Sequence, residues 1–287
     1  MRWFLFLWAL ARSRCALAFR ICSFNIQCFG ESKGAKPVVM EIITKIVARC
    51  DICLLMEIRD SSGAVVDHLL QDLNSYDRGH QYMYLASKRL GETKYKEQYV
   101  FIYRSDMVTI TSSYQYRGGT KGGMRSFARE PLIVRFSSPR TAIKDFVLIP
   151  LHAPPGEAVN EIDQLYNVFL DVRAKWDIED IMILGDLNAD CRYVSAKDWE
   201  SIRLRNKPGF FWLIGDNEDT TASASTDCAY DRIIVHGWKF FKALVPGSAK
   251  VFNVQEKFKL TEKEAVEVSD HYPVEVRLKL EAVHYEL

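Results

Sequence analysis

The sequence has little of several features that would set it apart from ordinary globular proteins. No stretch reaches the roughly 18 consecutive apolar residues that a membrane-spanning helix needs, which excludes an integral membrane protein of that kind. With 15 glycines and 9 prolines in 287 residues, the chain is neither collagenous nor of low complexity. An excess of charge of one sign is also missing, because 38 Lys and Arg face 37 Asp and Glu. A polyanionic partner would therefore have to be held by local positive charge.

The N-terminus carries the pattern of a secretory signal peptide. Arg2 precedes an apolar run at residues 3–11, and the small residues of Ala-Leu-Ala at 16–18 form a cleavage motif before Phe19. We expect residues 1–18 to be removed and 19–287 to form one domain; the alternative is an uncleaved amphipathic tail. Removal leaves 35 basic against 37 acidic residues, a net charge near −2. No Asn-x-Ser/Thr sequon is present, so N-glycosylation is not expected.

The last four residues, His-Tyr-Glu-Leu at 284–287, are similar to a signal for retrieval to the endoplasmic reticulum. The tyrosine departs from the usual signal. Secretion is therefore the expected outcome and retention the alternative.

Six cysteines remain after residue 18, and a secreted chain can oxidise them. Cys50 and Cys53 have the spacing of a redox or metal motif, but no second Cys or His pair lies at zinc spacing. We expect buried structural thiols there. Cys191 and Cys228 both flank polar loops, and a disulfide between them is predicted. Whether Cys22, Cys28, Cys50 and Cys53 stay reduced is left open.

Short apolar runs alternate with amphipathic stretches along the rest of the chain. These patterns predict strands at 20–25, 52–58, 82–87, 98–103, 132–136, 146–151, 181–184, 231–235 and 274–280. They predict helices at 38–49, 64–73 and 159–176, and the capping box Thr-Glu-Lys-Glu at 261–264 opens a further short helix. Several strands follow one another without a helix between them, so the sheets should be mixed. One domain of two packed sheets with outer helices is the simplest interpretation.

Polar side chains of a few kinds collect at the ends of these apolar strands. The residues are Asn25, Glu57, His152, Asp186, Asn188, Asp231, Asp270 and His271. Ligands bind at strand ends in α/β folds, so one rim carrying all of them would be a site. Carboxylate and amide oxygens suit a hard cation such as Mg²⁺ or Ca²⁺, and two histidines supply acid–base chemistry. The combination indicates hydrolysis of a phosphoester by an activated water.

The order and separation of these motifs resemble the deoxyribonuclease I family over residues 19 to 280. The motifs are Phe-Asn-Ile at 24–26, Met-Glu-Ile-Arg-Asp at 56–60, Tyr-Lys-Glu at 95–97, Arg-Glu-Pro at 129–131, Pro-Leu-His at 150–152, Gly-Asp-Leu-Asn-Ala-Asp-Cys at 185–191, Cys-Ala-Tyr-Asp-Arg at 228–232 and Ser-Asp-His-Tyr-Pro at 269–273. Phe-Arg-Ile-Cys at 19–22 and Arg-Cys-Asp-Ile at 49–52 look most like the DNase gamma and DNase X branches.

The resemblance implies an α/β/β/α sandwich of two mixed sheets, the fold of the endonuclease/exonuclease/phosphatase superfamily. It also implies a secreted endonuclease that cuts double-stranded DNA with Mg²⁺ and Ca²⁺, with Mn²⁺ as a substitute for Mg²⁺. The expected products carry 5′-phosphate and 3′-hydroxyl ends, and sequence preference should be slight.

Residue roles also follow from the resemblance. His152 should pair with Glu97 and His271 with Asp231. One histidine would be the base and the other the acid; His271 as base is favoured, and the reverse assignment is the alternative. Such a carboxylate fixes the imidazole tautomer and favours its charged form. The expected metal ligands are Asn25, Glu57 and Asp270, while Asp186, Asn188 and Asp231 would hold a second ion or the scissile phosphate.

The family's DNA contacts map onto Arg59, Tyr95, Arg129 and Tyr230. Arg59 and Tyr95 would meet the minor groove, and Arg129 would hold a backbone phosphate, so groove width rather than base identity is read. The structural alternatives are that Arg129 only neutralises Glu130 and that Tyr95 belongs to the core.

Two loops bear on calcium. A site in the loop at 219–226 is retained in outline through Asp219, Thr221 and Thr226. The glycine-rich loop at 117–125 holds three cations and should be mobile; phosphate binding and plain solvation are equally supported. Deoxyribonuclease I carries a disulfide and acidic calcium ligands there, whereas residues 117–126 here contain neither Cys nor Asp, so no calcium site is expected.

Two other functions compete with a monomeric DNA endonuclease. One is a phosphodiesterase of the same superfold that acts on lipids, inositol phosphates or abasic DNA, because fold does not fix substrate. The other is an inactive binding protein, for instance for actin. Arg59, Tyr95 and Arg129 disfavour the first, and the intact residues Glu97, His152, Asp231 and His271 disfavour the second.

Overall fold

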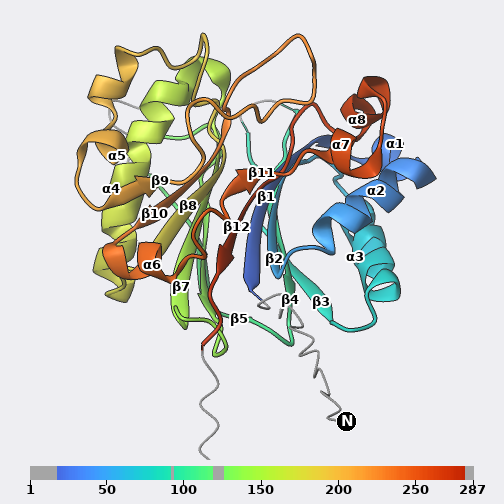
Figure 1. Cartoon of the computed structure of the whole chain (residues 1–287), viewed down its shortest axis with the longest axis horizontal. Coiled ribbons are helices and arrows are strands. Elements are labelled where there is room, and N and C mark those ends of the chain that lie inside the picture. Colours follow the sequence, from blue (N-terminus) through green and yellow to red (C-terminus); the bar gives the residue numbers. More distant parts are fainter. Residues whose placement is uncertain (1–17, 92–93, 119–125, 282–287) are drawn as a thin grey trace, which may run out of the picture.

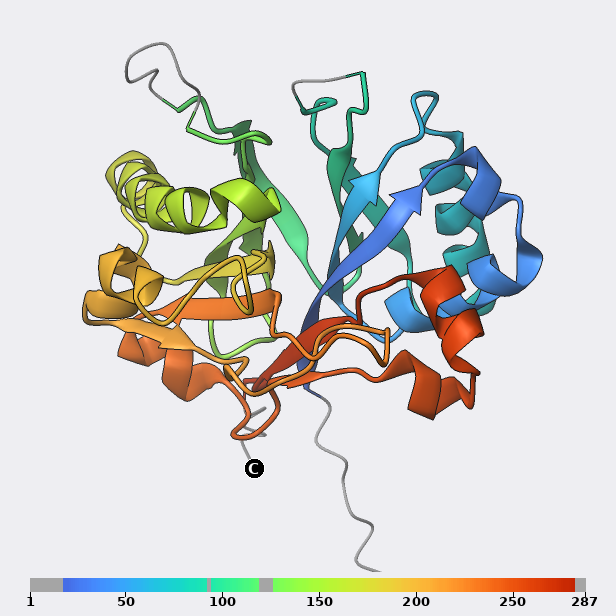
Figure 2. The ribbon, with the colours of Figure 1, turned by 90° about the horizontal axis from the view of Figure 1, so that it is seen from above.

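Two six-stranded sheets pack face to face, and helices cover the outer side of each sheet (Figure 1, Figure 2). This architecture comes from a computed structural model that describes residues 18–91, 94–118 and 126–281. The four layers are those of the α/β/β/α sandwich predicted from the sequence.

The first sheet has the strand order β11-β12-β1-β2-β4-β3. Its strands are β1 (Phe19–Phe29), β2 (Ile52–Ile58), β3 (Tyr82–Ala86), β4 (Gln98–Arg104), β11 (Lys250–Val251) and β12 (Val274–Leu278). The helices outside it are α1 (Glu31–Gly34), α2 (Pro37–Val47), α3 (Ala64–Tyr76), α7 (Val254–Phe258) and α8 (Glu262–Val268), at the right of Figure 1. The strand β1 runs parallel to β2 and antiparallel to β12, so the sheet is mixed.

The second sheet has the strand order β5-β6-β7-β8-β10-β9. Its strands are β5 (Thr109–Gln115), β6 (Leu132–Ser137), β7 (Asp145–His152), β8 (Ile181–Asp186), β9 (Phe210–Trp212) and β10 (Asp231–His236). Its helices are α4 (Ala158–Trp176), α5 (Arg203–Asn206) and α6 (Trp238–Ala243), with 3₁₀ turns at Pro155–Glu157 and Asp198–Ser201. Here β7 and β8 form the parallel pair, and β10 is antiparallel to β8.

The core between the sheets is made by alternate residues of the strands, because successive side chains of a strand point to opposite faces. Phe101 of the first sheet meets Phe136 of the second edge to face, with ring centroids 5.9 Å apart. Phe136 stacks in turn on Phe146 at 5.9 Å. All three rings are fully buried, and each contributes about 1.5–3 kcal/mol through its burial. This packing fixes how the edges of the two sheets face each other.

Every strand and helix predicted from the sequence is present, with ends that shift by a few residues. The capping box at Thr261 is formed, and Pro37 stands at the start of α2. The patterns missed β5, β9 and β11 and the short helices. The strand β5 is an edge strand rich in Thr and Ser, so it lacks the apolar alternation that reveals buried strands.

Two disulfides link the chain. Cys191 bonds Cys228, as predicted, and Cys22 bonds Cys50. Cys50 and Cys53 are both buried, as expected, and the redox state that the sequence left open is a disulfide for Cys50 and a thiol for Cys53. The reason is the parallel pairing of β1 with β2, which sets Cys22 opposite Cys53 and brings Cys50 to a Cα distance of 6.1 Å from Cys22. Spacing along the sequence does not reveal that pairing.

Three predictions fall on residues outside the described ranges. They are the signal peptide, of which residue 18 alone is described, the glycine-rich loop beyond residue 118 and the retrieval-like tail. Among the described residues, no helix is long and apolar enough to cross a membrane.

Candidate active site

The predicted site residues gather where strand ends of the two sheets face each other. His152 and Asp186 are the last residues of β7 and β8, and Glu57 is the last but one of β2. Asn25 lies within β1, opposite Met56, which is the neighbour of Glu57 on β2. The antiparallel strand β10 begins with Asp231 directly opposite Asp186. A hydrogen bond of 3.0 Å from Asn25 Nδ2 to Asp186 Oδ2 joins the two sheets at this point.

The backbone at this rim adopts conformations that side chains rarely accept. Glu57 and Asn188 have positive φ angles of 59° and 48° without being glycines, and such outliers cluster at functional sites. Gly185 has φ +144°, and a Cβ there would lie 1.9 Å from the carbonyl oxygen of Leu151. A glycine is therefore required for β8 to approach β7 closely enough to place Asp186 beside His152.

The first acid–base pair consists of Glu97, just before β4, and His152, at the end of β7. Glu97 Oε1 lies 2.5 Å from His152 Nδ1, and both residues are buried. Arg129 forms an ion pair with the same carboxylate oxygen and donates a 2.9 Å hydrogen bond to the carbonyl of His152. Burial disfavours the imidazolium, yet the charge and hydrogen bond of Glu97 outweigh it and raise the pKa of His152.

The second pair consists of Asp231, at the start of β10, and His271, just before β12. Asp231 Oδ2 lies 2.7 Å from His271 Nδ1. Burial again opposes the charged imidazole, but the negative charges of Asp231 and Asp186 raise the pKa of His271 well above its ordinary value. In both pairs Nδ1 faces the carboxylate, so Nε2 is the nitrogen left for a substrate.

The two imidazoles converge on one carboxylate. Asp186 Oδ2 is 3.7 Å from His152 Nε2 and 3.5 Å from His271 Nε2. Glu57 Oε1 lies 4.0 Å from His152 Nε2. Each pair also combines groups from both sheets. In the first pair the carboxylate comes from the first sheet and the imidazole from the second, and in the second pair the order is reversed. Both histidine–carboxylate pairs therefore form only where the sheets are packed together.

The oxygen atoms around this point fit a divalent cation. Asp186, Asp231 and His271 offer ligand atoms that all lie within 4.8 Å of one another. Asp231 Oδ1 and Asp270 Oδ1 are buried and have no hydrogen-bond partner among the described residues. A buried carboxylate oxygen without a partner is costly, and a hard cation is the partner that carboxylates favour.

Glu57 is held ionised and aimed at the same space. Burial alone would raise its pKa, but the charge of His152, the backbone N–H of Cys28 and the charge of Arg59 lower it to about 2. Asn188 donates its backbone N–H to Asp186 Oδ1 at 3.1 Å and its side-chain amide to the Ala153 carbonyl at 2.9 Å. The structure thus brings together the predicted catalytic and metal-ligating residues.

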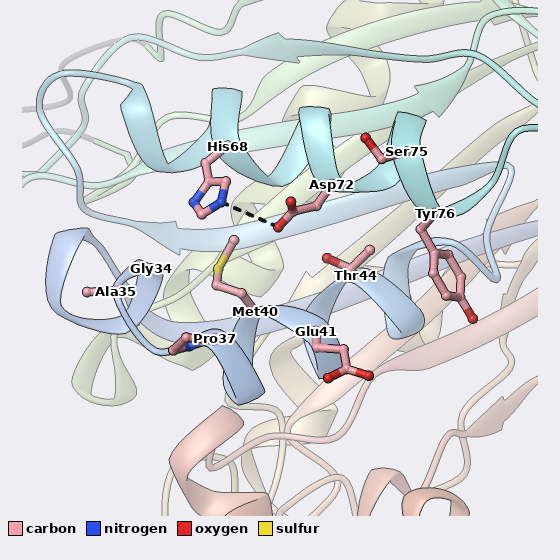
Figure 3. A pocket seen from close by; sticks show the side chains of 10 residues that line it. All are labelled: Gly34, Ala35, Pro37, Met40, Glu41, Thr44, His68, Asp72, Ser75 and Tyr76. Atoms are coloured by element: carbon pink, nitrogen blue, oxygen red, sulfur yellow. Dashed lines mark ion pairs between the residues drawn. The ribbon is translucent and has the colours of Figure 1, made fainter.

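A pocket of about 650 Å³ lies elsewhere, between α2 and α3 on the outside of the first sheet (Figure 3). His68 and Asp72 in it form an ion pair at 3.7 Å, and none of the predicted site residues lines it. The converging pairs, rather than this pocket, mark the candidate site, because two largely buried histidines meet there on a shared carboxylate, whereas the side chain of His68 is more than half exposed.

Comparisons with known proteins show the family of the chain. Residues 22–271 match the family model described as Endonuclease/Exonuclease/phosphatase family. Human deoxyribonuclease gamma is 50% identical over 265 residues, 92% of this chain and 87% of the relative. Pig deoxyribonuclease-1 is 50% identical over 265 residues, 92% of this chain and 93% of the relative.

The chain belongs to the deoxyribonuclease I family. Solved structures extend the likeness of fold at low identity. An endonuclease/exonuclease/phosphatase family protein from Leptotrichia buccalis gives a TM-score of 0.65 at 17% identity, covering 92% of this chain and 100% of that chain. One from Bacteroides vulgatus gives 0.61 at 15% identity, with the same coverages.

The structure also places the four residues that the sequence predicts to contact DNA. Tyr95 is 69% exposed, so it is not a core residue. Arg59 donates a 2.8 Å hydrogen bond to Glu57 and is about one-third exposed. Tyr230 packs between Tyr193 and His271, with ring centroids 5.4 Å and 6.3 Å away. Arg129 pairs with Glu97, so the simple alternative of an Arg129–Glu130 pair does not describe its main contacts.

The predicted calcium loop is attached to the second pair. Asp219 Oδ1 accepts hydrogen bonds from the backbone N–H and the hydroxyl of Thr221, at 2.9 Å and 2.6 Å. The Thr221 hydroxyl also reaches the carbonyl oxygen of Thr226 at 2.9 Å. Thr221 forms a β-bridge with His271. The three predicted residues therefore lie together, and their loop supports the histidine.

Sequence reasoning missed Arg232 of β10, whose side chain links the loop after β8 to the segments before β10. Its guanidinium is fully buried and donates to the carbonyls of Ala229, Ile214 and Ala189 at 2.7–3.0 Å, and to Asp216 at 2.8 Å. The available signal was a cation at the start of an otherwise apolar strand, directly after Asp231. A buried arginine in that position must find several acceptors.

Proposed function

We propose that this protein is a secreted, divalent-metal-dependent endonuclease that hydrolyses phosphodiester bonds of double-stranded DNA with little sequence preference. The products carry 5′-phosphate and 3′-hydroxyl ends. The observation that carries the proposal is the convergence of two histidine–carboxylate pairs on Asp186, with their Nε2 atoms 3.7 Å and 3.5 Å from one oxygen. Two poised imidazoles on either side of a phosphate position are what general acid–base hydrolysis requires.

In the proposed reaction, His271 takes a proton from the attacking water through Nε2, and Asp231 stabilises the imidazolium that forms. The oxygen attacks phosphorus and the bond to the 3′ oxygen breaks. His152 gives its Nε2 proton to that leaving oxygen, and Glu97 holds the ring in the tautomer this needs. Arg129, fixed on Glu97 and on the His152 carbonyl, keeps the acid in place.

Metal binding is assigned to the anionic residues between the pairs. Glu57, Asn25 and Asp270 would hold one cation, and Asp186, Asn188 and Asp231 would hold a second cation or the scissile phosphate. A bound Mg²⁺, or Mn²⁺ in its place, supplies positive charge for the phosphorane-like transition state. The two orphaned carboxylate oxygens, Asp231 Oδ1 and Asp270 Oδ1, support this assignment. Ca²⁺ is assigned to the loop of Asp219, Thr221 and Thr226.

DNA contacts are assigned to the exposed residues around the pairs. Arg59 and Tyr95 meet the minor groove, Tyr230 lies against the substrate strand near His271, and Arg129 faces a phosphate.

Two disulfides support passage through an oxidising compartment, in line with the predicted signal peptide and with secretion. Actin binding, retention in the endoplasmic reticulum and a monomeric state stay predictions from the sequence.

The test is nicking of supercoiled plasmid by the purified protein with Mg²⁺ and Ca²⁺, with EDTA, and beside His152→Ala. We expect metal-dependent nicking that EDTA abolishes and the variant lacks. A lipid-headgroup phosphodiesterase assay runs in parallel. If well-folded wild-type protein hydrolyses the headgroup but does not nick DNA, the DNA assignment is overturned. If it has neither activity, a binding protein is favoured.

A further inference from the structure

A buried tyrosine hydroxyl and a buried carboxylate lie behind the first acid–base pair, and the proposed reaction uses neither. They belong to Tyr99 on β4 and Glu161 in the first turn of α4, each 2% exposed. Burying such groups is costly unless they bind a partner, so their partners show what they do. Both act on the segment at 127–129, which carries Arg129.

The Tyr99 hydroxyl makes two hydrogen bonds to main-chain groups, one of His152 and one of Arg129. It accepts one from the backbone N–H of His152 at 2.9 Å and donates one to the carbonyl of Arg129 at 3.3 Å. A single oxygen from the first sheet therefore ties the acid and the arginine together. Phenylalanine would fill the same space and leave both backbone groups without this partner.

Glu161 holds the residue before the arginine. Its Oε1 accepts a 2.7 Å hydrogen bond from the backbone N–H of Ala128. Its Oε2 is buried and has no hydrogen-bond partner among the described residues. Burial raises the pKa of Glu161 to about 7, so the side chain serves as an acceptor whether or not it is charged. Glutamine can keep the bond to Ala128 and alanine cannot.

The guanidinium of Arg129 thus stands on a segment fixed at three successive residues. The side chain of Phe127 is buried in the core, Ala128 is held by Glu161 and the carbonyl of Arg129 is held by Tyr99. From that position Arg129 reaches Glu97 and the carbonyl of His152. A shift of this segment would move the arginine, the carboxylate and the imidazole together.

We propose that Tyr99 and Glu161 are positioning residues, which act on the reaction by fixing residues 128 and 129 and so holding Arg129 on Glu97 and His152. This inference rests on the proposed function for its kinetic part. It assigns both residues no contact with substrate.

The test compares Glu161→Ala, Glu161→Gln and Tyr99→Phe with wild type in plasmid cleavage. We expect Glu161→Ala and Tyr99→Phe to lose about 10-fold or more in kcat/KM, mainly in kcat, because misplacement of catalytic groups costs transition-state stabilisation. Glu161→Gln should stay within about 3-fold of wild type, since it retains the acceptor. Matched controls are Tyr103→Phe on β4 and Asp171→Asn on α4, which should cleave as wild type does.

A double-mutant cycle separates positioning from a general effect on folding. If Glu161 acts through Arg129, Glu161→Ala should cost less than about 3-fold when added to Arg129→Ala. Multiplied losses in the double variant would overturn the proposal, as would wild-type kcat/KM in Glu161→Ala and Tyr99→Phe. Thermal unfolding of each variant shows whether it is folded under assay conditions.

Amide hydrogen exchange provides a readout that does not depend on activity. Glu161→Ala should speed exchange at Ala128, and Tyr99→Phe should speed exchange at His152, while the controls leave both unchanged. If wild type fails to cut DNA but these exchange changes appear, the proposed function fails and the anchoring stands. Unchanged exchange in both variants overturns the anchoring itself, and it does so even if Tyr99→Phe lowers activity.

Discussion

The two acid–base pairs look alike but are supported differently. The Glu97–His152 pair carries a cation, because Arg129 binds the carboxylate and the main chain of the histidine. Among the described residues, the ion-pair partner of Asp231 is His271, and the loops around that pair are held by the Cys191–Cys228 disulfide and by buried Arg232. Asp186 favours protonation of both histidines, but the charge of Arg129 opposes protonation of His152. Two similar dyads thus obtain different proton affinities from their surroundings.

The largest expected effect is the loss of either imidazole. His152→Ala and His271→Ala should each lower turnover by about 10²–10⁴-fold or more, the contribution of a positioned acid or base. The double variant should lose far less than the product of the two, because the groups act as a unit. Single-turnover cleavage measures these losses, and circular dichroism shows that folding survives. Near-wild-type cleavage by either single variant contradicts the assigned mechanism.

Neutralising the carboxylate of each pair should change the pH dependence of cleavage differently for the two pairs. In Glu97→Gln, burial and Arg129 remain while the anion is gone, so the pKa of His152 falls and the acid is lost first at alkaline pH. In Asp231→Asn the pKa of His271 also falls, which leaves the base neutral at lower pH. We expect losses of about 10²-fold in each at pH 7.

The measurement is the pH profile of kcat/KM for both variants. The alkaline limb of Glu97→Gln should move to lower pH, and the acid limb of Asp231→Asn should move to lower pH. If the shifts appear on the opposite limbs, the assignment of His271 as base and His152 as acid is reversed.

The two disulfides should differ in what they protect. They close loops of similar length, with separations of 28 and 37 residues, so chain entropy predicts about 3–4 kcal/mol of stability from each. Cys191 and Cys228, however, join the loops that follow Asp186 and precede Asp231. We expect the Cys191→Ala/Cys228→Ala variant to lose about 10-fold in kcat at a temperature where both variants are folded. The Cys22→Ala/Cys50→Ala variant should keep its kcat, and denaturant titration checks the stabilities.

The smallest expected effect is in the loop beneath His271. Thr221→Val removes the hydroxyl that links Asp219 and Thr226, at a cost of about 1 kcal/mol. Activity should fall only a few-fold, through His271 and not His152. Withholding Ca²⁺ with EGTA while Mg²⁺ is kept should reproduce this loss in wild type and add little in the variant. Equal loss in both would place the calcium elsewhere.

Much of this molecule could be predicted from the sequence, for reasons that particular residues show. Buried strands such as β2 and β8 are nearly continuous apolar runs that end in Glu57 and Asp186, so both the strand and its polar end are visible. The motif order and the family resemblance then supplied the pairing of His152 with Glu97 and of His271 with Asp231, which lie 55 and 40 residues apart.

What escaped prediction depends on contacts between distant segments. Cys22 finds Cys50 only because β1 and β2 run parallel. Glu161 has no local pattern that marks it as a buried anchor, since its partner is a backbone group of another segment. For Arg232, the cation in an apolar strand is visible in the sequence, but its acceptors in distant loops are not. The strand β5 lies at a sheet edge, where a polar sequence is tolerated.

The crossing of both pairs between the sheets has a consequence for biosynthesis. The carboxylates Glu57 and Glu97 are made early, whereas His271 and β12, which completes the first sheet beside β1, are among the last parts of the described chain to be made. A chain that is still being translated has no second imidazole and no closed sheet on which to place one. Under the proposed reaction, a chain that ends before His271 therefore lacks both the base and the strand beside β1, and we expect such a chain not to cleave DNA.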